Sequence, residues 1–452
     1  MMTTSTVAEL ADRAVHRRAI EAVSWGMPAV NFDLMLQAML RVAKAGPGSN
    51  KIVYWSRPFH WQNQTLTPNP DTIYFMPFFD TKEVGPIVLE IPAAGGGSLV
   101  GSVDDAWQTA IEDVGPAGVD KGKGGKYLIL PPGYDAPMPD GYIAMPSQTF
   151  AGYALLRSSL NSAGEADVAQ AVAYAKRIRL YPLTQAANPP PSVFVDAVDG
   201  VFDSTIPYDM RFFESLDRIV QREPWIERDK AMIDMLKTIG IEKGKPFNPD
   251  FHTQEILQSA LEEAHAWMDS KYDEFFPPLV EGKHWALPAS PDVIEGLSTT
   301  FAAPGSYPID GRGRAYSYAY FSAKHLGAGQ YYLMAIKDKA GQSFDGARDY
   351  RLTVPANAPV RQYWSATAYD RNTHALIRDT PRSSRSSLSP GLQKNADGSC
   401  DVFFGPAPPP GREANWVPTS SKGQFEVLFR FYGPEQPLFD KTWVLPDIET
   451  VR

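Results

Sequence analysis

Several carboxylate side chains gather around one tryptophan in the first third of the sequence. Trp107 is flanked by Asp104, Asp105, Glu112 and Asp113. Two carboxyl groups that face each other can act as a general acid and a general base when their surroundings separate their pKa values, and sugar hydrolysis uses such a pair. Asp104 and Asp113 are therefore candidate catalytic residues, and Trp107 is a candidate substrate-binding residue. The alternative is that these carboxylates only accept hydrogen bonds from turn amides.

Aromatic residues upstream of these carboxylates are suited to line a binding cleft. Trp55 and His60 lie in the segment YWSRPFHWQ, and Tyr74 ends the segment TPNPDTIY, which also contains Asn69. Trp55, Tyr74 and Asn69 complete the candidate substrate-binding set, for a sugar or a planar ligand. His60 is the histidine best placed for proton transfer and is the third candidate catalytic residue. Packing in the core is the alternative for the aromatic side chains.

A glycine-rich stretch follows, DVGPAGVDKGKGGKYLILPPGY (113–134). Its spacing matches neither a phosphate-binding P-loop nor a dinucleotide fingerprint. The glycines at 115, 118, 122, 124 and 125 permit positive φ, as in a loop folded against a ligand or a neighbouring domain. Two interpretations stay open for this stretch: a structural hairpin, or a pocket wall in which Lys126 binds an anion.

Composition and residue spacing argue against several kinds of partner. Cys400 is the only cysteine, and neither an HExxH motif nor a pair of histidines at i,i+4 occurs, so the sequence predicts no metal site and no cofactor. The formal net charge is −9 and no basic run is present, which predicts no nucleic-acid binding. No apolar segment reaches the ~20 residues of a membrane span, so we expect no membrane partner.

The elements that must position these residues are mostly short apolar runs typical of strands, with helical periodicity at the start and in the middle of the chain. We predict a mainly β fold with helical segments (α+β). Gly26 and Pro28 predict a break in the opening helical section, and RAYSYAYFSA (314–323) predicts a strand. The predicted sections are N-terminal helices (1–45), an N-terminal β domain (46–160), a connecting and largely helical segment (161–303), and a C-terminal β-sandwich or jelly-roll-like domain (304–452).

Several long motifs resemble a known two-domain family. The segments TPNPDTIY (67–74), GPIVLEIP (85–92), VDDAWQ (103–108) and the glycine-rich stretch follow one another as in the bacterial domain of unknown function 1254. The segments 394–419 and 429–449 resemble its C-terminal companion, domain of unknown function 1214. The resemblance implies two β-rich domains joined by a helical segment, and it implies no particular reaction. Members of the family are often exported.

Two hypotheses of function follow from these residues. The first is a small-molecule enzyme, a hydrolase or lyase that uses carboxylate acid–base chemistry on a glycan-like or aromatic substrate. The second is a noncatalytic protein that binds a glycan or another small ligand. The start of the sequence has no signal peptide, which predicts a cytoplasmic location, or a periplasmic or secreted one if such a peptide was removed. Homo-oligomerisation stays open.

Overall fold

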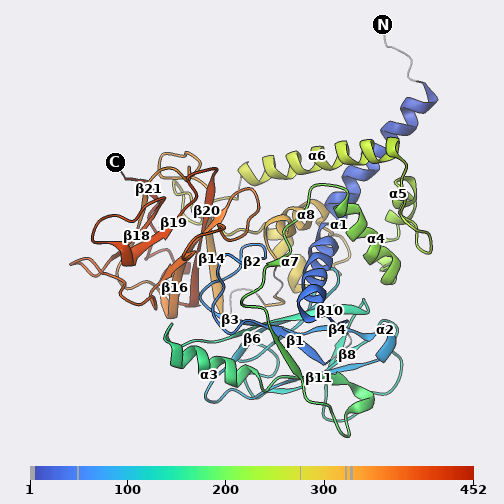
Figure 1. Ribbon diagram of the computed structural model, residues 1–452, viewed down its shortest axis with the longest axis horizontal. Helices are drawn as coiled ribbons and strands as arrows, with labels where there is room; N and C mark the ends of the chain where they lie inside the picture. Colours follow the sequence, from blue (N-terminus) through green and yellow to red (C-terminus); the bar gives the residue numbers. More distant parts are fainter. Residues whose placement is uncertain (1–5, 48–49, 275, 321–322, 326–328, 452) are drawn as a thin grey trace.

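The computed structural model describes residues 6–47, 50–274, 276–320, 323–325 and 329–451. Two β-rich domains lie side by side, with helices packed against both (Figure 1). The fold class predicted from the sequence, mainly β with helical segments, is confirmed. In the described residues, no helix combines the length and the apolarity that a bilayer crossing requires.

The first domain is built on a larger sheet that packs against a smaller one. Alternate residues of a strand point to opposite faces. In β10, Ala154 and Leu156 therefore face the core shared with the smaller sheet, while Tyr153 and Leu155 face the long first helix. The larger sheet has the order β12 (Val193–Asp196), β1 (Lys51–Tyr54), β3 (Ile73–Met76), β10 (Ala151–Ser158), β6 (Leu99–Asp105), β7 (Ala110–Val114), with β4 (Phe78–Asp80) beside β10.

The smaller sheet takes in part of the chain expected to be a connection. Its order is β11 (Arg179–Pro182), β5 (Ile87–Ile91), β8 (Gly125–Leu130), β9 (Ile143–Pro146). Strand β11 pairs with β5, strand β12 pairs with β1, and helix α3 (Glu165–Ala175) covers the same core. A further pair joins β2 (Asn63–Gln64) to β13 (Phe202–Asp203). The first domain therefore extends beyond the predicted boundary at residue 160.

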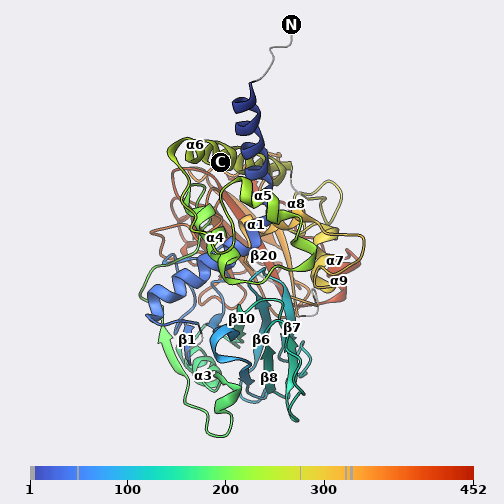
Figure 2. The ribbon, with the colours of Figure 1, turned by 90° about the vertical axis from the view of Figure 1, so that its right-hand side faces the viewer.

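Helix α1 (Val7–Ala43) begins at a capping box in which the Thr6 hydroxyl accepts from the Glu9 amide and the Glu9 carboxylate accepts from the Thr6 amide. The predicted break at Gly26 and Pro28 is wrong, because the helix continues through both residues and is buried around them. Gly26 permits a close approach of helix α1 to Leu216: a Cβ at this position would lie 2.8 Å from a methyl carbon of Leu216, which would have to shift. Figure 2 shows α1 changing direction along its length, as expected for a helix that contains a proline.

Other helices surround α1. The strand predicted for 314–323 is wrong over its first half, because α8 (Ile309–Tyr318) is a helix, and residues 321 and 322 lie outside the described part. Asn31 of α1 donates hydrogen bonds to the carbonyls of Tyr316 and Ala319, at 2.7 and 2.9 Å. Such tertiary contacts outweigh the strand preference that the alternating tyrosines indicate. Helices α4 (Arg211–Arg222), α5 (Met232–Thr238) and α6 (Phe251–Glu274) also contact α1. Three short helices lie elsewhere in the described residues: α2 (Thr81–Val84), α7 (Pro291–Ser298) and α9 (Gln436–Phe439).

The C-terminal domain packs one sheet against another as a sandwich. Alternate residues of β18 and β20, among them Val402 and Phe429, point into a shared apolar core. One sheet has the order β14 (Gln330–Ala335), β20 (Phe425–Pro434), β16 (Val360–Asp370), β17 (Ser384–Ser386). The other has the order β19 (Trp416–Pro418), β18 (Cys400–Gly405), β15 (Tyr350–Val354), β21 (Glu449–Thr450).

Glu223, at the end of α4, fastens the helical layer to the larger sheet. Its carboxylate accepts the amides of Phe150 and Ala151 at 2.6 and 3.0 Å. Burial raises the pKa of Glu223 to about 6, against the opposing effect of these two hydrogen bonds. Because its folded pKa is higher than its unfolded one, this group favours folding below about pH 4.5, and that contribution is lost as the pH rises through 6.

We therefore expect Glu223→Gln to change the pH dependence of stability. Relative to the variant, the wild type should lose about 2 kcal/mol of unfolding free energy between pH 4 and pH 7. Urea unfolding of both proteins across this pH range measures the difference. A constant difference would show that Glu223 has the same pKa in the folded and unfolded chains.

Candidate functional site

The segment TPNPDTIY (67–74) connects the two domains through hydrogen bonds, and we call it the joint. Arg430 of β20 donates to the carbonyls of Thr67 and Pro68 at 2.9 and 3.2 Å, and the Tyr369 hydroxyl donates to Pro68 at 2.6 Å. The Thr67 amide in turn donates to the His374 carbonyl at 2.6 Å. These contacts fix the C-terminal sandwich on the edge of the first domain.

Beside this joint, a cavity of about 450 Å³ lies between the domains. Its floor comes from β6, β7 and β10 of the larger sheet, and its opposite wall comes from β14, β16 and β20 of the sandwich. We call it the interdomain cleft. Its lining is Thr72, Ser98, Val100, Gly101, Ser102, Asp113, Val114, Pro116, Ala117, Leu155, Arg157, Ser159, Leu160, Ala323, His325, Gly329, Gln330, Arg361, Gln362, Tyr363, Tyr432 and Gly433.

Strand pairing places a guanidinium in the floor of the interdomain cleft. Arg157 of β10 lies opposite Tyr74 of β3 on one side and opposite Val100 of β6 on the other. Its Nε donates to the Tyr74 hydroxyl at 3.1 Å, and its Cζ lies 5.3 Å from the centre of the Tyr74 ring. No carboxylate of the described residues forms an ion pair with Arg157. The floor therefore carries a positive charge that is partnered by tyrosine.

Asp113, a predicted catalytic residue, does line the interdomain cleft. Its Oδ1 accepts from the Ser102 hydroxyl at 2.7 Å and from the Lys324 amide at 2.9 Å, and its Oδ2 accepts from the His325 amide at 2.8 Å. The neighbouring Glu112 lies 3.0 Å from the Lys324 ammonium and 3.6 Å from Nε2 of His325. These contacts hold residues 323–325 against β7 and place the exposed His325 ring at the cleft.

Asn69, a predicted substrate-binding residue, lies behind the aromatic wall of the interdomain cleft. Tyr363 and Tyr432 form this wall, with ring centres 4.3 Å apart and ring planes 13° apart. The Asn69 side-chain amide donates to both hydroxyls, at 3.4 Å to Tyr363. Burial raises the pKa of both tyrosines, so their hydroxyls stay neutral at physiological pH. Asn69 and Tyr74 are buried, so they support the residues that line the cleft.

The two predicted tryptophans lie in the core, and the predicted histidine contacts backbone groups. Trp55 is 2 % exposed and packs edge-on against Phe59 and Phe202. Trp107 is 4 % exposed and packs on Trp25, with ring centres 4.6 Å apart. His60 contacts the Val198 carbonyl through Nε2 at 3.1 Å, and its Nδ1 accepts the Gln62 amide at 3.3 Å. None of these three side chains lines the cleft.

Asp104 and Lys126 also lie outside the lining of the interdomain cleft. Asp104 is fully buried on β6, opposite Tyr153 of β10, and it raises the pKa of that tyrosine, after the larger effect of burial. Lys126 belongs to β8 of the smaller sheet, where its half-exposed ammonium lies 3.8 Å from the Glu90 carboxylate. The structure therefore does not bring Asp104 and Lys126 together with Asp113 in one cavity.

The glycine-rich stretch forms the turn between β7 and β8. The Asp120 carboxylate accepts the amides of Gly115 and Gly124, at 2.6 and 2.9 Å, and thereby closes the turn. Positive φ occurs at Gly115, Gly122 and Gly124, whereas Gly118 is not in that conformation and Gly125 begins the strand. This geometry is that of a structural turn in which Pro116 and Ala117 reach the cleft.

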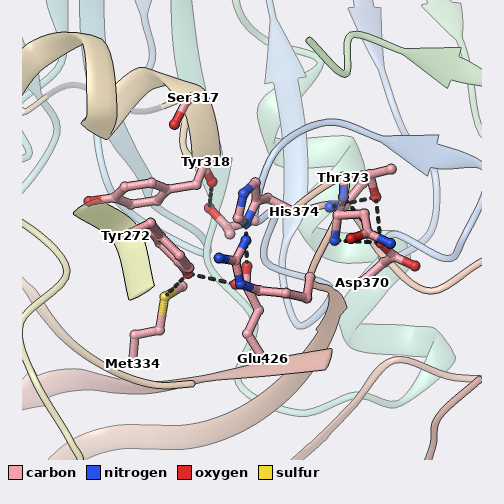
Figure 3. A network of polar contacts seen from close by, with 12 residues as sticks. Tyr272, Ser317, Tyr318, Met334, Asp370, Thr373, His374 and Glu426 are labelled. Atoms are coloured by element: carbon pink, nitrogen blue, oxygen red, sulfur yellow. Dashed lines mark hydrogen bonds and ion pairs between the residues drawn. The ribbon is translucent and has the colours of Figure 1, made fainter. Parts of the chain in front are cut away.

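A second polar cluster lies deep beneath the joint, where α6 meets the sandwich. The Tyr272 hydroxyl donates to the Glu426 carboxylate at 2.6 Å, and the other oxygen of Glu426 lies 2.8 Å from Nδ1 of His374 (Figure 3). Glu426 is completely buried. Arg371 lies beside this cluster and pairs with Asp269 and Asp273 of α6, at 2.8 Å each. The cluster ties α6 to the C-terminal domain.

Sequence reasoning missed Arg157, Tyr363, Tyr432 and His325 as cleft residues. One signal was present: Arg157 is a lone arginine at the end of the apolar run AGYALLRSS, and a charge on a buried strand requires a specific partner. Tyr363, Tyr432 and His325 give no such signal, because only the packing of the two domains brings them beside β10. In the described residues, no group of three histidine, cysteine or acidic side chains is placed to hold a metal ion.

The chain is similar to two solved structures, of which the first supports the fold described above. The chain resembles the crystal structure of the VPA0106 protein from Vibrio parahaemolyticus at 18 % identity and a TM-score of 0.56, over 96 % of this chain and 100 % of that one. It also matches an uncharacterised protein from Burkholderia cenocepacia at 11 % identity and a TM-score of 0.44, over 98 % and 95 % of the two chains. The first likeness shows the fold alone.

Comparison with protein families covers both β domains. A search of curated proteins gave no match. Residues 49–182 match the family described as a protein of unknown function, DUF1254, and residues 329–436 match the one described as a protein of unknown function, DUF1214. The first match ends at β11 and the second spans most of the sandwich, so the cleft lies between the two matched regions. The protein belongs to the family that carries a DUF1254 domain followed by a DUF1214 domain.

Proposed function

We propose that the protein binds a small organic molecule in the interdomain cleft. The observation that carries this proposal is the cavity itself, whose volume of about 450 Å³ is in the range of small-molecule sites. Its lining combines apolar side chains such as Leu155 and Leu160 with a tyrosine wall and a few polar groups. Sites between two domains are a common location for such ligands, because both partners contribute to the lining.

Acid–base catalysis on the bound molecule is the second candidate, as a hydrolase or lyase acting on a glycan-like or aromatic substrate. It is favoured by His325, whose ring lies at the cleft with Glu112 3.6 Å from Nε2. A carboxylate beside an imidazole can orient it as a general base. Asp113 is less suited to this role, because both of its oxygens already accept hydrogen bonds.

Filling the cleft is the direct test of ligand binding. Ala117 is exposed and lines the cleft, so Ala117→Trp should block it without disturbing the core. We expect compounds selected by thermal shift from a metabolite library to bind the wild type, and to bind Ala117→Trp at least tenfold more weakly in calorimetry. The exposed Ala136, outside the cleft, provides the control Ala136→Trp. Equal binding to all three proteins would place the ligand elsewhere.

The same compounds separate binding from catalysis. Each binder is incubated with the wild type and with His325→Gln, and the mixture is followed by mass spectrometry. Turnover by the wild type that falls about 100-fold in His325→Gln, with affinity retained, would support the enzyme. Saturable binding without any turnover would support the noncatalytic protein.

A further inference from the structure

Arg157, which is partly buried, differs from the buried arginines Arg430 and Arg371 in how its N–H groups are used. Arg430 donates to two backbone carbonyls, to the Tyr369 hydroxyl and to the Thr367 hydroxyl, so both of its terminal nitrogens have acceptors within the protein. Arg371 pairs with Asp269 and Asp273 at 2.8 Å each. For Arg157, the hydrogen bond found among the described residues is the one from Nε to Tyr74, and this side chain lines the interdomain cleft. Its terminal N–H groups are available to a bound molecule.

A partly buried guanidinium at the floor of a cleft favours a hydrogen-bond acceptor, and the best acceptor is an anion. Arginine stays charged at any physiological pH, and burial of its charge is costly unless a partner is provided. The tyrosines around Arg157 provide oxygen atoms but no negative charge at neutral pH, because burial raises the pKa of Tyr432 and of Tyr332. Among the described residues, the cleft therefore provides no counter-ion at the point where a carboxylate would form two parallel hydrogen bonds.

The remaining charges of the cleft limit the charge of the ligand. Arg361 adds a second positive group on its exposed wall. Asp113 adds one negative charge, which is held by the Ser102 hydroxyl and two backbone amides. A ligand with one acidic group can avoid Asp113, whereas a second negative charge would be repelled by it. Beyond these groups the lining is apolar or hydroxylic, apart from the His325 imidazole and the side-chain amides of Gln330 and Gln362.

We propose that the interdomain cleft selects an organic monocarboxylate, whose carboxylate pairs with Arg157 and whose apolar or aromatic body lies against Tyr363, Tyr432 and Leu155. This inference rests on the proposed function, because it specifies the class of molecule that the same cleft binds. Recognition is by charge at the floor and by shape at the wall, so the neutral amide of a given acid is rejected although it has the same size.

The test compares acids with their amides. The probes are 2-naphthoate, 4-phenylbutyrate and hexanoate, each beside its carboxamide, with phenyl phosphate as the dianionic probe. Calorimetry measures their affinity for the wild type, Arg157→Gln and Arg157→Lys. The control is Arg57→Gln, which removes a 59 % exposed arginine that pairs with Asp199 outside the cleft. Arg157→Lys keeps the charge and protects the test if the glutamine variant does not fold.

We expect at least one acid to bind the wild type and Arg57→Gln tenfold or more tightly than its amide does. This preference should disappear in Arg157→Gln and be partly retained in Arg157→Lys. Acids and amides that bind equally well, or an acid preference that survives in Arg157→Gln, would overturn the inference and leave the proposed function standing. Tighter binding of phenyl phosphate than of every acid would also overturn it. Absence of binding by all probes would overturn it too, and would count against the proposed function only if the library screen were also blank.

Discussion

Replacing Glu426 by alanine is expected to destabilise the folded protein by about 3–5 kcal/mol. The carboxylate is fully buried and accepts from the Tyr272 hydroxyl while it contacts the imidazole of His374. The substitution removes both contacts and leaves a cavity beneath the joint, and each effect is costly in a buried polar cluster. Urea unfolding followed by tryptophan fluorescence measures the loss.

Two further variants show whether the effect comes from this cluster. Glu281→Ala removes an exposed carboxylate and should change the unfolding free energy by less than about 0.5 kcal/mol. Glu426→Gln keeps the volume and one acceptor, so it should lose less than the alanine variant. A loss below about 1 kcal/mol in Glu426→Ala would contradict the view that this cluster holds α6 on the sandwich.

Gly115→Ala is expected to cost about 3–4 kcal/mol, from two causes that act together. Gly115 has φ of +89°, a conformation that strains a residue with a side chain, and a Cβ there would lie 1.8 Å from the Leu99 carbonyl oxygen. The obstacle is backbone of the neighbouring strand β6, so it cannot move aside as a side chain would. Thermal unfolding should show a clear drop in midpoint.

Gly133→Ala is the matched control, because it isolates the backbone conformation from the close contact. Gly133 also has positive φ, of +75°, but nothing lies within 4 Å of the position of its Cβ. It should therefore lose only about 1–2 kcal/mol. Equal losses in the two variants would mean that the turn after β7 relaxes and that the contact with Leu99 has no effect of its own.

The parts of the fold that the sequence predicted are those that depend on local pattern. Strands β8 and β20 are short runs rich in apolar residues, and a proline or glycine marks the end of each run. This local pattern is sufficient to predict that both are strands. The helical middle of the chain has the periodicity of α4 and α6. By contrast, the tyrosines of α8 alternate as in a strand, and only the contact of Asn31 with the carbonyls of Tyr316 and Ala319 shows why they form a helix.

The candidate site was less predictable because it is assembled from residues far apart in the chain. Arg157 and Tyr432 come from different domains, and no local pattern connects them. The joint could not be predicted from sequence either. Thr67 and His374 have φ of +40° and +54°, and a glycine or asparagine at these positions would have indicated this conformation, whereas threonine and histidine do not. Asp113 was found because clustered carboxylates are visible in sequence, although its contacts differ from those of an acid–base pair.

Helix α1 has a consequence for the order in which the protein is made. Its residues leave the ribosome well before those of α8, and Asn31 bonds to a carbonyl 285 residues later in the chain. At 5–20 residues per second, roughly 15 to 60 seconds separate the synthesis of these two partners. During that interval α8 is not yet present, so the apolar surface of α1 that it later covers stays exposed. We therefore expect the nascent chain to depend on holding chaperones until the second half of the protein emerges.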